Sequence, residues 1–489
     1  MQPWSQPLLW KGVSGAVACD PYFGNVVLLM GYEGANGSTG APGMNDESPS
    51  AHGTATVTGA SVITTSQFKF GSSSLQANLT PNTSTITFPY SADWILSSSN
   101  SDQFTIEAWI RPNSSVLTQN LGESIVAVQS GLSHFLWNLY TGTSGNGELT
   151  FSAQTAGGTA WSIINSTGIT WTPGTWYHVA VDKDATGKVR LYRSGVMVAS
   201  NTPPDSSIYT GTGFPLNIGN QGTGGGVRPF DGNIDELRIT KGVARYANDS
   251  GFAVPTAAFP RVACPDPHFS QVVLLMGYEG ANGSTGSPGM LDESPMAHGL
   301  ATVTAPFAIT TAQFKFGTAS LSCTGSGRLS YNDGPEWGFG TGQFTVETWI
   351  YPTSVASNLY DIVAKWNAPG QFGWRLYQDT AGLKWDVSTD GSNSFTDLAG
   401  GTLTVNTWFH VAVDYDGIKY RLYVNGVMVS SSTTARNIAN PNIILTVGAG
   451  PISQYVFSGD IDELRITKGF ARYASDAGFA VPTSAFPRS

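Results

Sequence analysis

The sequence predicts an all-β protein made of two tandem antiparallel β-sandwich domains. The first observation is an internal repeat: the run VVLLMGYEGANGSTG occurs without a substitution at residues 26–40 and again at 272–286. The second is an alternation of apolar and polar residues, which has the period of a strand and not of a helix. The third is the abundance of turn residues, with 58 Gly and 27 Pro in 489 residues. Many short strands joined by tight turns have this composition.

Further blocks repeat in the same order in the two halves of the chain. QFTIEAWI returns as QFTVETWI, TWYHVAVD returns as TWFHVAVD, and IDELRITKG occurs twice. Such repetition marks one structural unit that is present twice. Each unit is long enough to bury its own core without disulfides or metal. We therefore predict an N-terminal arm over residues 1–16 and two domains, over residues 17–260 and 261–489.

The strands of the first domain follow in order from the alternation. One face of the strand over residues 104–111 is apolar: Phe104, Ile106, Ala108 and Ile110. The other face carries Glu107 and Trp109, so both faces are expected to be covered. Similar strands are expected at Ile125–Val128, Phe135–Tyr140, Glu148–Ala153, Trp176–Asp182, Val189–Arg193 and Ile234–Thr240. In the second domain the Asn425-Gly426 pair predicts a hairpin turn. About a dozen strands per domain, with no long amphipathic helix, predict two packed sheets of the sandwich or jelly-roll type.

Composition excludes several classes of function. Charged residues make up only 12% of the chain and the formal net charge is −10, so the basic surface that binds nucleic acid is missing. No segment approaches the ~20 apolar residues of a membrane span, and the first residues do not resemble a secretory signal. Of three cysteines, Cys19 and Cys264 occupy equivalent repeat positions and Cys323 stands alone. We expect buried free thiols, with a bond between chains of an assembly as the alternative.

The arm over residues 1–16 has no counterpart in the second half and contains Trp4 and Trp10. Two interpretations stay open for it. One is a frayed terminus, and the other is a segment that docks onto a partner.

The ordered blocks resemble a known family. They comprise the apolar first strand with its GANG loop, KFG, FTxExWI, TWxHVAVD, RLYxxGxxV and FxGxIDELRITKGxARY. Together they resemble the laminin-G-like, concanavalin A-like lectin/glucanase jelly roll, in the form that recurs in virion proteins of tailed bacteriophages. The resemblance covers about residues 20–260 and 265–489. The family's usual opening has His-Phe-Asp where this chain has Gly-Tyr-Glu at 31–33 and 277–279, which replaces one carboxylate by a longer one.

The acidic, Gly-rich loop after the first strand is a candidate for structural calcium. Calcium takes oxygen ligands from carboxylates, amides and backbone carbonyls. The alternative is a turn in which Asp and Asn cap backbone amides. The resemblance implies that an Asp of the last strand completes each site. The candidate ligands are Glu33, Asn36, Asp46 and Asp235 in the first domain, and Glu279, Asn282, Asp292 and Asp462 in the second.

Sugar binding requires flat apolar side chains beside hydrogen-bonding groups. Most tryptophans recur at equivalent positions in the two repeats, which indicates a role in the scaffold. Tryptophan and tyrosine residues that do not recur in the other repeat, and that have Phe, Leu or no aromatic residue opposite them, are the candidates for glycan contact, with local core packing as the alternative. They are Trp161, Trp171, Tyr360, Trp366 and Trp385.

Catalysis is not expected. Glycoside hydrolysis uses two carboxylates that flank the bond. Glu107 and Glu347 recur on equivalent strands, but neither has an acidic residue two positions away. His178 and His410 fit core or rim positions, and no zinc-type Cys/His cluster is present.

The expected function is therefore that of a non-enzymatic bacteriophage virion surface protein, either a capsid decoration or a tail-fibre component. The resemblance implies lectin-like modules that bind host or environmental glycans and pack with other virion proteins, in part through the arm. A homo-oligomer or other symmetric assembly is expected, without nucleic acid or membrane as partner. The alternatives are an extracellular carbohydrate-binding or adhesion protein of a cell, and a glycan hydrolase.

Overall fold

A computed structural model of the chain describes residues 19–77, 84–113, 122–129, 135–142, 148–155, 158–164, 169–222, 228–356, 359–368 and 370–489. The predicted arm over residues 1–16 lies outside these ranges. The chain divides into two compact units, Met1–Cys264 and Pro265–Ser489. The division falls slightly after the predicted boundary at residue 260, because Arg261 forms ion pairs with Glu47 and Glu236 of the first unit.

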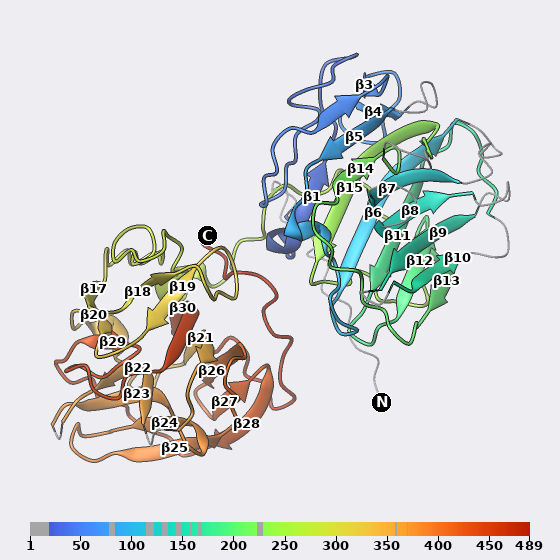
Figure 1. The fold of residues 1–489 in the computed structure, drawn as a ribbon. Helices are drawn as coiled ribbons and strands as arrows, with labels where there is room; N and C mark the ends of the chain where they lie inside the picture. The colour runs from blue at the N-terminus through green and yellow to red at the C-terminus, as the bar shows by residue number, and fades with distance from the viewer. Residues whose placement is uncertain are drawn as a thin grey trace. The chain divides into compact units, whose positions relative to one another are not determined.

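Unit 1 consists of two antiparallel sheets packed face to face, as Figure 1 shows. Sheet A has the strand order β13 (Val196–Asn201), β12 (Val189–Arg193), β11 (Tyr177–Lys183), β6 (Phe104–Pro112), β15 (Gly232–Lys241), β4 (Ser74–Ala77) and β3 (Val62–Thr64), and β1 (Val26–Met30) also pairs with β15. Sheet B has the order β10 (Ala160–Ile164), β9 (Leu149–Gln154), β8 (Phe135–Thr141), β7 (Glu123–Gln129), β14 (Leu216–Ile218), β5 (Thr85–Phe88) and β2 (Thr56–Thr58).

Unit 2 repeats this topology strand for strand. Its first sheet has the order β18 (Ala308–Thr310), β19 (Ser320–Cys323), β30 (Gly459–Lys468), β21 (Phe344–Pro352), β26 (Phe409–Tyr415), β27 (Tyr420–Val424) and β28 (Val427–Ser432), and β16 (Val272–Met276) pairs with β30. Its second sheet has the order β17 (Thr302–Thr304), β20 (Arg328–Tyr331), β29 (Leu445–Val447), β22 (Tyr360–Trp366), β23 (Phe372–Asp379), β24 (Gly382–Val387) and β25 (Phe395–Gly400). The predicted all-β class with two antiparallel sandwiches is confirmed.

The helices of the described residues are single 3-10 turns. They are η1 (Phe23–Asn25), η2 (Ala92–Trp94), η3 (Phe269–Gln271) and η4 (Pro335–Trp337). None of them is long or apolar enough to cross a lipid bilayer.

A tight hairpin turn connects β12 to β13 in unit 1, and an equivalent turn connects β27 to β28 in unit 2. In unit 2 the turn between β27 and β28 contains Asn425 (φ 47°) and Gly426 (φ 75°), and in unit 1 Ser194 (φ 49°) and Gly195 (φ 80°) take the same place. Two residues with positive φ make a turn whose twist matches that of the flanking strands. The hairpin predicted from Asn-Gly is therefore confirmed.

The two faces of β6 are both buried, as the alternation predicts. Phe104, Ile106 and Ile110 point into the core between the sheets. Glu107 lies on the opposite face and is also fully buried. The segment that follows β15 covers that face, since Thr105 Oγ1 donates a hydrogen bond to the backbone oxygen of Val243 at 3.0 Å.

Candidate functional site

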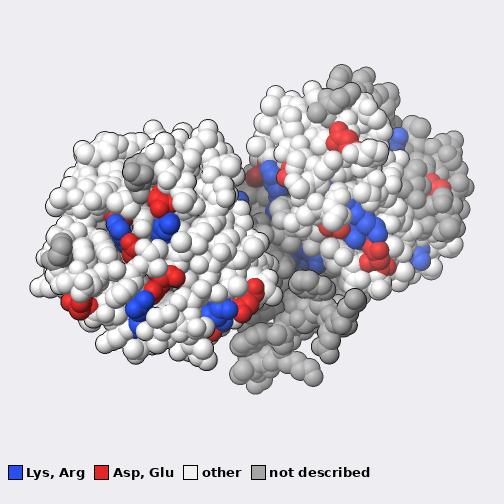
Figure 2. All heavy atoms as spheres, turned by 90° about the horizontal axis from the view of Figure 1, so that it is seen from below, with Lys and Arg blue, Asp and Glu red and all other residues white. Residues whose placement is uncertain are grey.

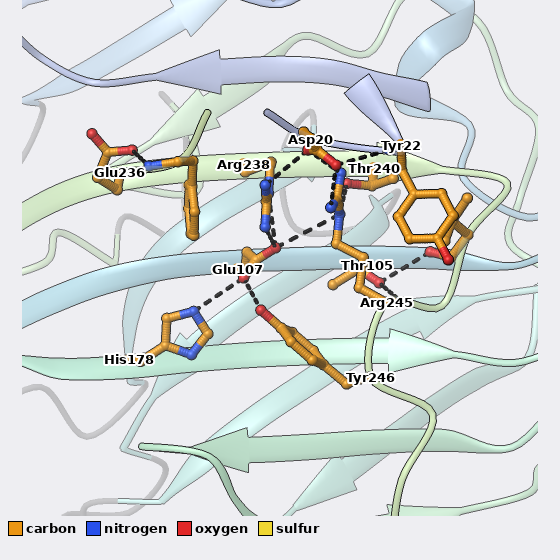
Figure 3. Close-up of polar contacts among 12 residues, drawn as sticks. Asp20, Tyr22, Thr105, Glu107, His178, Glu236, Arg238, Thr240, Arg245 and Tyr246 are labelled. Carbon is orange, nitrogen blue, oxygen red and sulfur yellow. Dashed lines mark hydrogen bonds and ion pairs between the residues drawn. The ribbon is translucent and has the colours of Figure 1, made fainter. Parts of the chain in front are cut away.

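A buried ionic cluster occupies the covered face of sheet A in unit 1 (Figure 3). Glu107, on β6, accepts hydrogen bonds from Arg238 of β15 through Nε (2.9 Å) and Nη2 (2.7 Å). Its second oxygen lies 3.1 Å from His178 Nε2 and accepts a hydrogen bond from the Tyr246 hydroxyl. Arginine, histidine and tyrosine thus converge on a single carboxylate from two neighbouring strands and the covering segment.

The environment of Glu107 keeps its carboxylate ionised and enclosed. Burial alone would raise the pKa of this group, but the charge of Arg238 and the hydrogen bond to His178 outweigh burial and hold the pKa well below its usual range. The side chain has no exposed surface. A glycosidase carboxylate must reach the bond that it cleaves, and Glu107 has no such access in this structure.

The cluster is repeated in unit 2 with the same chemistry. Glu347 accepts hydrogen bonds from Arg465 at 2.9 Å and from the Tyr473 hydroxyl, and lies 3.2 Å from His410 Nε2. Its side chain is also fully enclosed. The predicted core role of His178 and His410 therefore holds in both units.

Asp20 extends the cluster to the beginning of the described chain. Its Oδ2 forms ion pairs with Arg238 Nη1 at 3.0 Å and with Arg245 Nη2 at 2.8 Å. The neighbouring Cys19 forms a disulfide with Cys264. The expectation of free thiols was wrong for these two cysteines, because residues 261–264 return to the start of unit 1 and do not begin unit 2. Cys323 is free and buried, as expected.

The repeated IDELR motif has a structural explanation. The pairing of β15 with β6 is interrupted by a bulge between Asp235 and Arg238, and Glu236 has a φ of 49°. A bulge turns neighbouring side chains in different directions. Asp235 accepts the backbone amide of Lys69, and Glu236 pairs with Arg261 at 2.8 Å. The motif thus fastens three separate segments to β15.

The candidate calcium ligands Glu33, Asn36 and Asp46 of unit 1 accept hydrogen bonds from the protein itself, in part from segments distant in sequence. Both oxygens of Glu33 accept from Ser72, and Asn36 Oδ1 accepts the Thr65 amide at 3.2 Å. Asp46 accepts the Leu29 amide at 3.0 Å as well as hydrogen bonds from Ser48 and His52. These are the amide-capping contacts that the alternative interpretation expects.

The candidate calcium ligands of unit 2 accept equivalent hydrogen bonds. Glu279 accepts from Thr318, Asn282 from the Thr311 amide, Asp292 from the Leu275 amide and Asp462 from the Lys315 amide. Among the described residues, no three His, Cys, Asp or Glu side chains gather as metal ligands. Calcium binding at these loops therefore stays a prediction.

One oxygen of the last-strand carboxylate lacks a hydrogen-bond partner within the described chain in each unit, namely Oδ1 of Asp235 and of Asp462. Burial raises the pKa of Asp235 to about 7 and that of Asp462 to about 8. A buried acid of this kind is stabilised in its protonated form. These two groups are therefore sensitive to pH near neutrality.

The aromatic glycan candidates lie in or against the cores. Trp171 and Trp385 have no exposed surface, so the prediction that they contact a ligand is wrong; they fill the core where the two repeats differ in packing. Trp366 is 6% exposed and its ring stacks on Phe372. The remaining candidates pack partly buried against the cores: Trp161, whose Nε1 donates to the backbone oxygen of Ser207 at 3.2 Å, and Tyr360, whose hydroxyl lies 3.1 Å from Ser354 Oγ.

The loop after the first strand holds a histidine between two carboxylates, which sequence reasoning did not assign beyond local hydrogen bonds. His52 Nδ1 lies 2.8 Å from Asp46 and Nε2 lies 3.1 Å from Asp93. Burial alone would lower the pKa of His52, but the hydrogen bonds to Asp46 and Asp93 outweigh burial and raise it to about 9. Asp93 is distant in sequence, so only the fold reveals this contact.

The equivalent histidine of unit 2 borders a pocket of about 200 Å³. His298 lies 2.7 Å from Asp292 and 3.2 Å from Glu336 of η4. The pocket is lined by His298, Leu300, Thr302, Ser330, Tyr331, Asn332, Asp333 and Glu336. Hydroxyl, amide and carboxylate groups therefore surround a small space that also has one apolar wall.

A buried lysine supports one wall of this unit 2 pocket. Lys365, on β22, is fully buried; its Nζ contacts the carboxylate of Asp333 and donates to the backbone oxygen of Ile443 at 3.1 Å. Burial lowers the pKa of Lys365, although the charge of Asp333 opposes this effect. Leaving a charged amine in this position without its partner is costly, so Asp333 is held in place.

A larger depression of about 650 Å³ lies in unit 1 beside η2. Its two charged residues already serve the fold: Lys241 Nζ donates to the backbone oxygen of Ala92 at 3.0 Å, and Asp102 accepts from Ser98 and Ser99. The unit 2 pocket combines an amide and two carboxylates with the apolar side chain of Leu300, and we take it as the better candidate for ligand recognition. Figure 2 shows that charged side chains on the face drawn form small groups of opposite sign on an otherwise uncharged surface, without a basic patch.

Comparisons with known proteins agree with this architecture. The sequence matches the family described as the concanavalin A-like lectin/glucanases superfamily over residues 81–245 and 324–472. No curated protein matches the chain.

Among solved structures, domain 4 of AbnA, a GH43 extracellular arabinanase from Geobacillus stearothermophilus in complex with arabinotriose, is similar with 16% identity and a TM-score of 0.31, over 41% of this chain and 94% of that one. Domains LG4-5 of the mouse laminin alpha1 chain have 12% identity and a TM-score of 0.24, over 78% and 86%. The binding domain of Paraclostridial Mosquitocidal Protein 1 has 10% identity and a TM-score of 0.35, over 84% and 92%. None of these likenesses assigns a ligand to this chain.

Proposed function

Since the chain belongs to the concanavalin A-like lectin/glucanases superfamily, we propose that it is a non-enzymatic glycan-binding protein displayed on the surface of a tailed-bacteriophage virion. The observation that carries this proposal is the polar pocket of unit 2. Asn332, Asp333 and Glu336 place an amide and two carboxylates beside the apolar side chain of Leu300. Sugar rings present hydroxyls along their edge and an apolar face, and such a wall complements both.

The enclosure of the recurring glutamates supports a binding role without catalysis. Glu107 and Glu347 are saturated by arginine, histidine and tyrosine and have no exposed surface. In the pocket, Asp333 and Glu336 are already engaged with Lys365 and His298. Hydrolysis requires one carboxyl that donates a proton and another that attacks or activates water, whereas the ion pairs of Asp333 and Glu336 hold these two groups as hydrogen-bond acceptors.

Two observations support the virion surface. The ordered sequence blocks resemble those of phage virion proteins, and the Cys19–Cys264 disulfide suits an oxidising location, which virion surfaces provide. Within a symmetric particle, many copies would bind weak glycan ligands together through their high effective concentration. Residues 1–16, which lie outside the described ranges, are the proposed contact with other virion proteins.

Glycan-array binding of the full chain tests the function. We expect binding to a defined set of glycans without release of reducing ends. Binding to no glycan would refute the function. Quantitative proteomics of purified particles tests the location, since tens of copies indicate a tail fibre, hundreds indicate a decoration, and absence from particles refutes the virion role.

A further inference from the structure

The segment over residues 290–304, which leads into β17, differs from its counterpart in unit 1 in one respect. MNDESPSAHGTATVT at residues 44–58 becomes MLDESPMAHGLATVT at 290–304. All three changes replace a polar residue by an apolar one: Asn45 by Leu291, Ser50 by Met296 and Thr54 by Leu300.

The three apolar side chains are exposed to solvent. Leu291, Met296 and Leu300 are 37%, 52% and 54% exposed. The loop backbone does not require them, because unit 1 forms the same isolated bridge with Asn45 and Thr54 where unit 2 has Leu291 and Leu300. Leu291 and Leu300 adjoin across this bridge, and neighbouring exposed apolar side chains are candidates for a contact surface.

Leu300 lines the unit 2 pocket described above, and the other walls of this pocket carry polar residues that unit 1 lacks. Trp94 and Trp337 both donate from Nε1 to the backbone oxygen five residues earlier, which aligns the two segments. Asn332 and Asp333 then stand where unit 1 has Pro89 and Tyr90.

Its supporting lysine is also specific to unit 2. Lys365 of IVAKW takes the place of Val128 in IVAVQ, at the same position in the sheet. Several substitutions that are specific to unit 2 therefore meet at this pocket: Leu300, Asn332 and Asp333 line it, and Leu291 adjoins Leu300 through their bridge.

We propose, on the basis of the glycan-binding function above, that this pocket binds a single uncharged sugar that carries a methyl group, either a 6-deoxyhexose or an N-acetylhexosamine. The space of about 200 Å³ is smaller than the ~300–1,000 Å³ of sites for larger ligands, so it suits one ring. Asp333 and Glu336 accept hydroxyl hydrogen bonds and repel anionic sugars. The sugar methyl packs on Leu300.

Titration calorimetry of the full chain tests this assignment with matched methyl glycosides: L-rhamnose against L-mannose, L-fucose against L-galactose, and N-acetylglucosamine against glucose, with glucuronic acid as the anionic sugar. Burial of one methyl group gives about fourfold tighter binding. We therefore expect at least that preference for one methyl-bearing sugar over its hydroxyl counterpart, and no binding of the glucuronide. Rhamnose or fucose as the preferred ligand identifies the 6-deoxy class, and N-acetylglucosamine identifies the N-acetyl class.

Unit 1 supplies the matched variants. The triple variant L291N/M296S/L300T introduces the residues with which unit 1 forms the same loop, so it is expected to fold and to lose the methyl preference. The control N45L/S50M/T54L adds equal apolar surface to unit 1 and is expected to leave binding unchanged. A methyl preference that persists undiminished in the triple variant would overturn this site while the proposed function stands. A preference for glucuronic acid would overturn the ligand class, and binding of no glycan by the native chain would refute the function itself.

Discussion

Replacing Glu107 by alanine removes the acceptor that organises the covered face of unit 1. Arg238 loses both of its hydrogen bonds to Glu107 and keeps only Asp20, at 3.0 Å. His178 and Tyr246 lose their contact with the same carboxylate. Removal of one partner from a buried ion pair costs about 3–5 kcal/mol. Because Asp20 still compensates part of the Arg238 charge, we expect a loss of about 3 kcal/mol in the free energy of unfolding of unit 1.

For a domain of this size, 1 kcal/mol corresponds to a change in Tm of about 2–4 °C, so the expected shift is roughly 10 °C. Differential scanning calorimetry of the full chain measures it. Glu347→Ala makes the equivalent change in unit 2 and should shift the transition of that unit. Lys188→Ala, which removes a partly exposed ion pair with Asp249, is the control and should change little.

The result that would refute this reasoning is a Glu107→Ala variant with unchanged stability that has lost an activity on glycans. That outcome would mean that the carboxylate is reached by substrate and that the enclosed cluster does not describe its role. Glu107→Gln separates the two cases further, because the amide oxygen still accepts from Arg238 but cannot serve as an acid or a nucleophile.

Three other predictions concern the Cys19–Cys264 disulfide, His52 and Asp235. Cys19→Ser opens a loop of 245 residues and should destabilise unit 1 by about 3–5 kcal/mol in thermal scans without reductant; an equal Tm for native and variant chains would contradict this role of the disulfide. His52 has a folded pKa of about 9, above its ordinary 6.5, so its stabilisation is complete below pH 6.5 and is lost as pH rises through 9; urea titrations of His52→Gln should lack this step, and an unchanged pH profile would argue against the contact. Asp235 has a pKa raised to about 7, so unit 1 should lose stability as pH rises from 4 to 7 and Asp235→Asn should flatten that slope. The predicted calcium site is tested in the same scans: a rise in Tm on addition of calcium that Asp235→Asn abolishes would support it, and an unchanged Tm would argue against it.

The sequence was sufficient for the fold because period and turn chemistry are local properties. The alternation over residues 104–111 predicted which face of β6 enters the core, and Asn425-Gly426 predicted its hairpin. The repeat predicted two sandwiches because each copy carries its own complete set of strands.

The contacts of the candidate site depend on segments that meet only after folding. Cys19 finds Cys264 because residues 261–264 return to unit 1, and equivalent repeat positions gave no sign of this pairing. Asp93 reaches His52 across the fold. Trp171 and Trp385 are buried in the cores, where unit 2 has Leu403 and unit 1 has Phe151, so a tryptophan that does not recur reports a difference in packing between repeats and not exposure.

Side-chain oxygens are equally hard to assign from sequence. Glu33 and Asn36 have the composition of calcium ligands but accept hydrogen bonds from Ser72 and the Thr65 amide. These contacts are amide caps, as the alternative interpretation expects. Whether a side-chain oxygen caps an amide or binds calcium depends on which backbone amides the fold places beside it.

The most direct test of glycan binding without catalysis follows binding and cleavage in one sample. The full chain is titrated with the glycan that it binds best on an array, and reducing ends are measured in the same mixture over many hours. The account predicts saturable binding at a constant number of reducing ends. Reducing ends that increase with the native chain, and not with Glu107→Gln or Glu347→Gln, would contradict it.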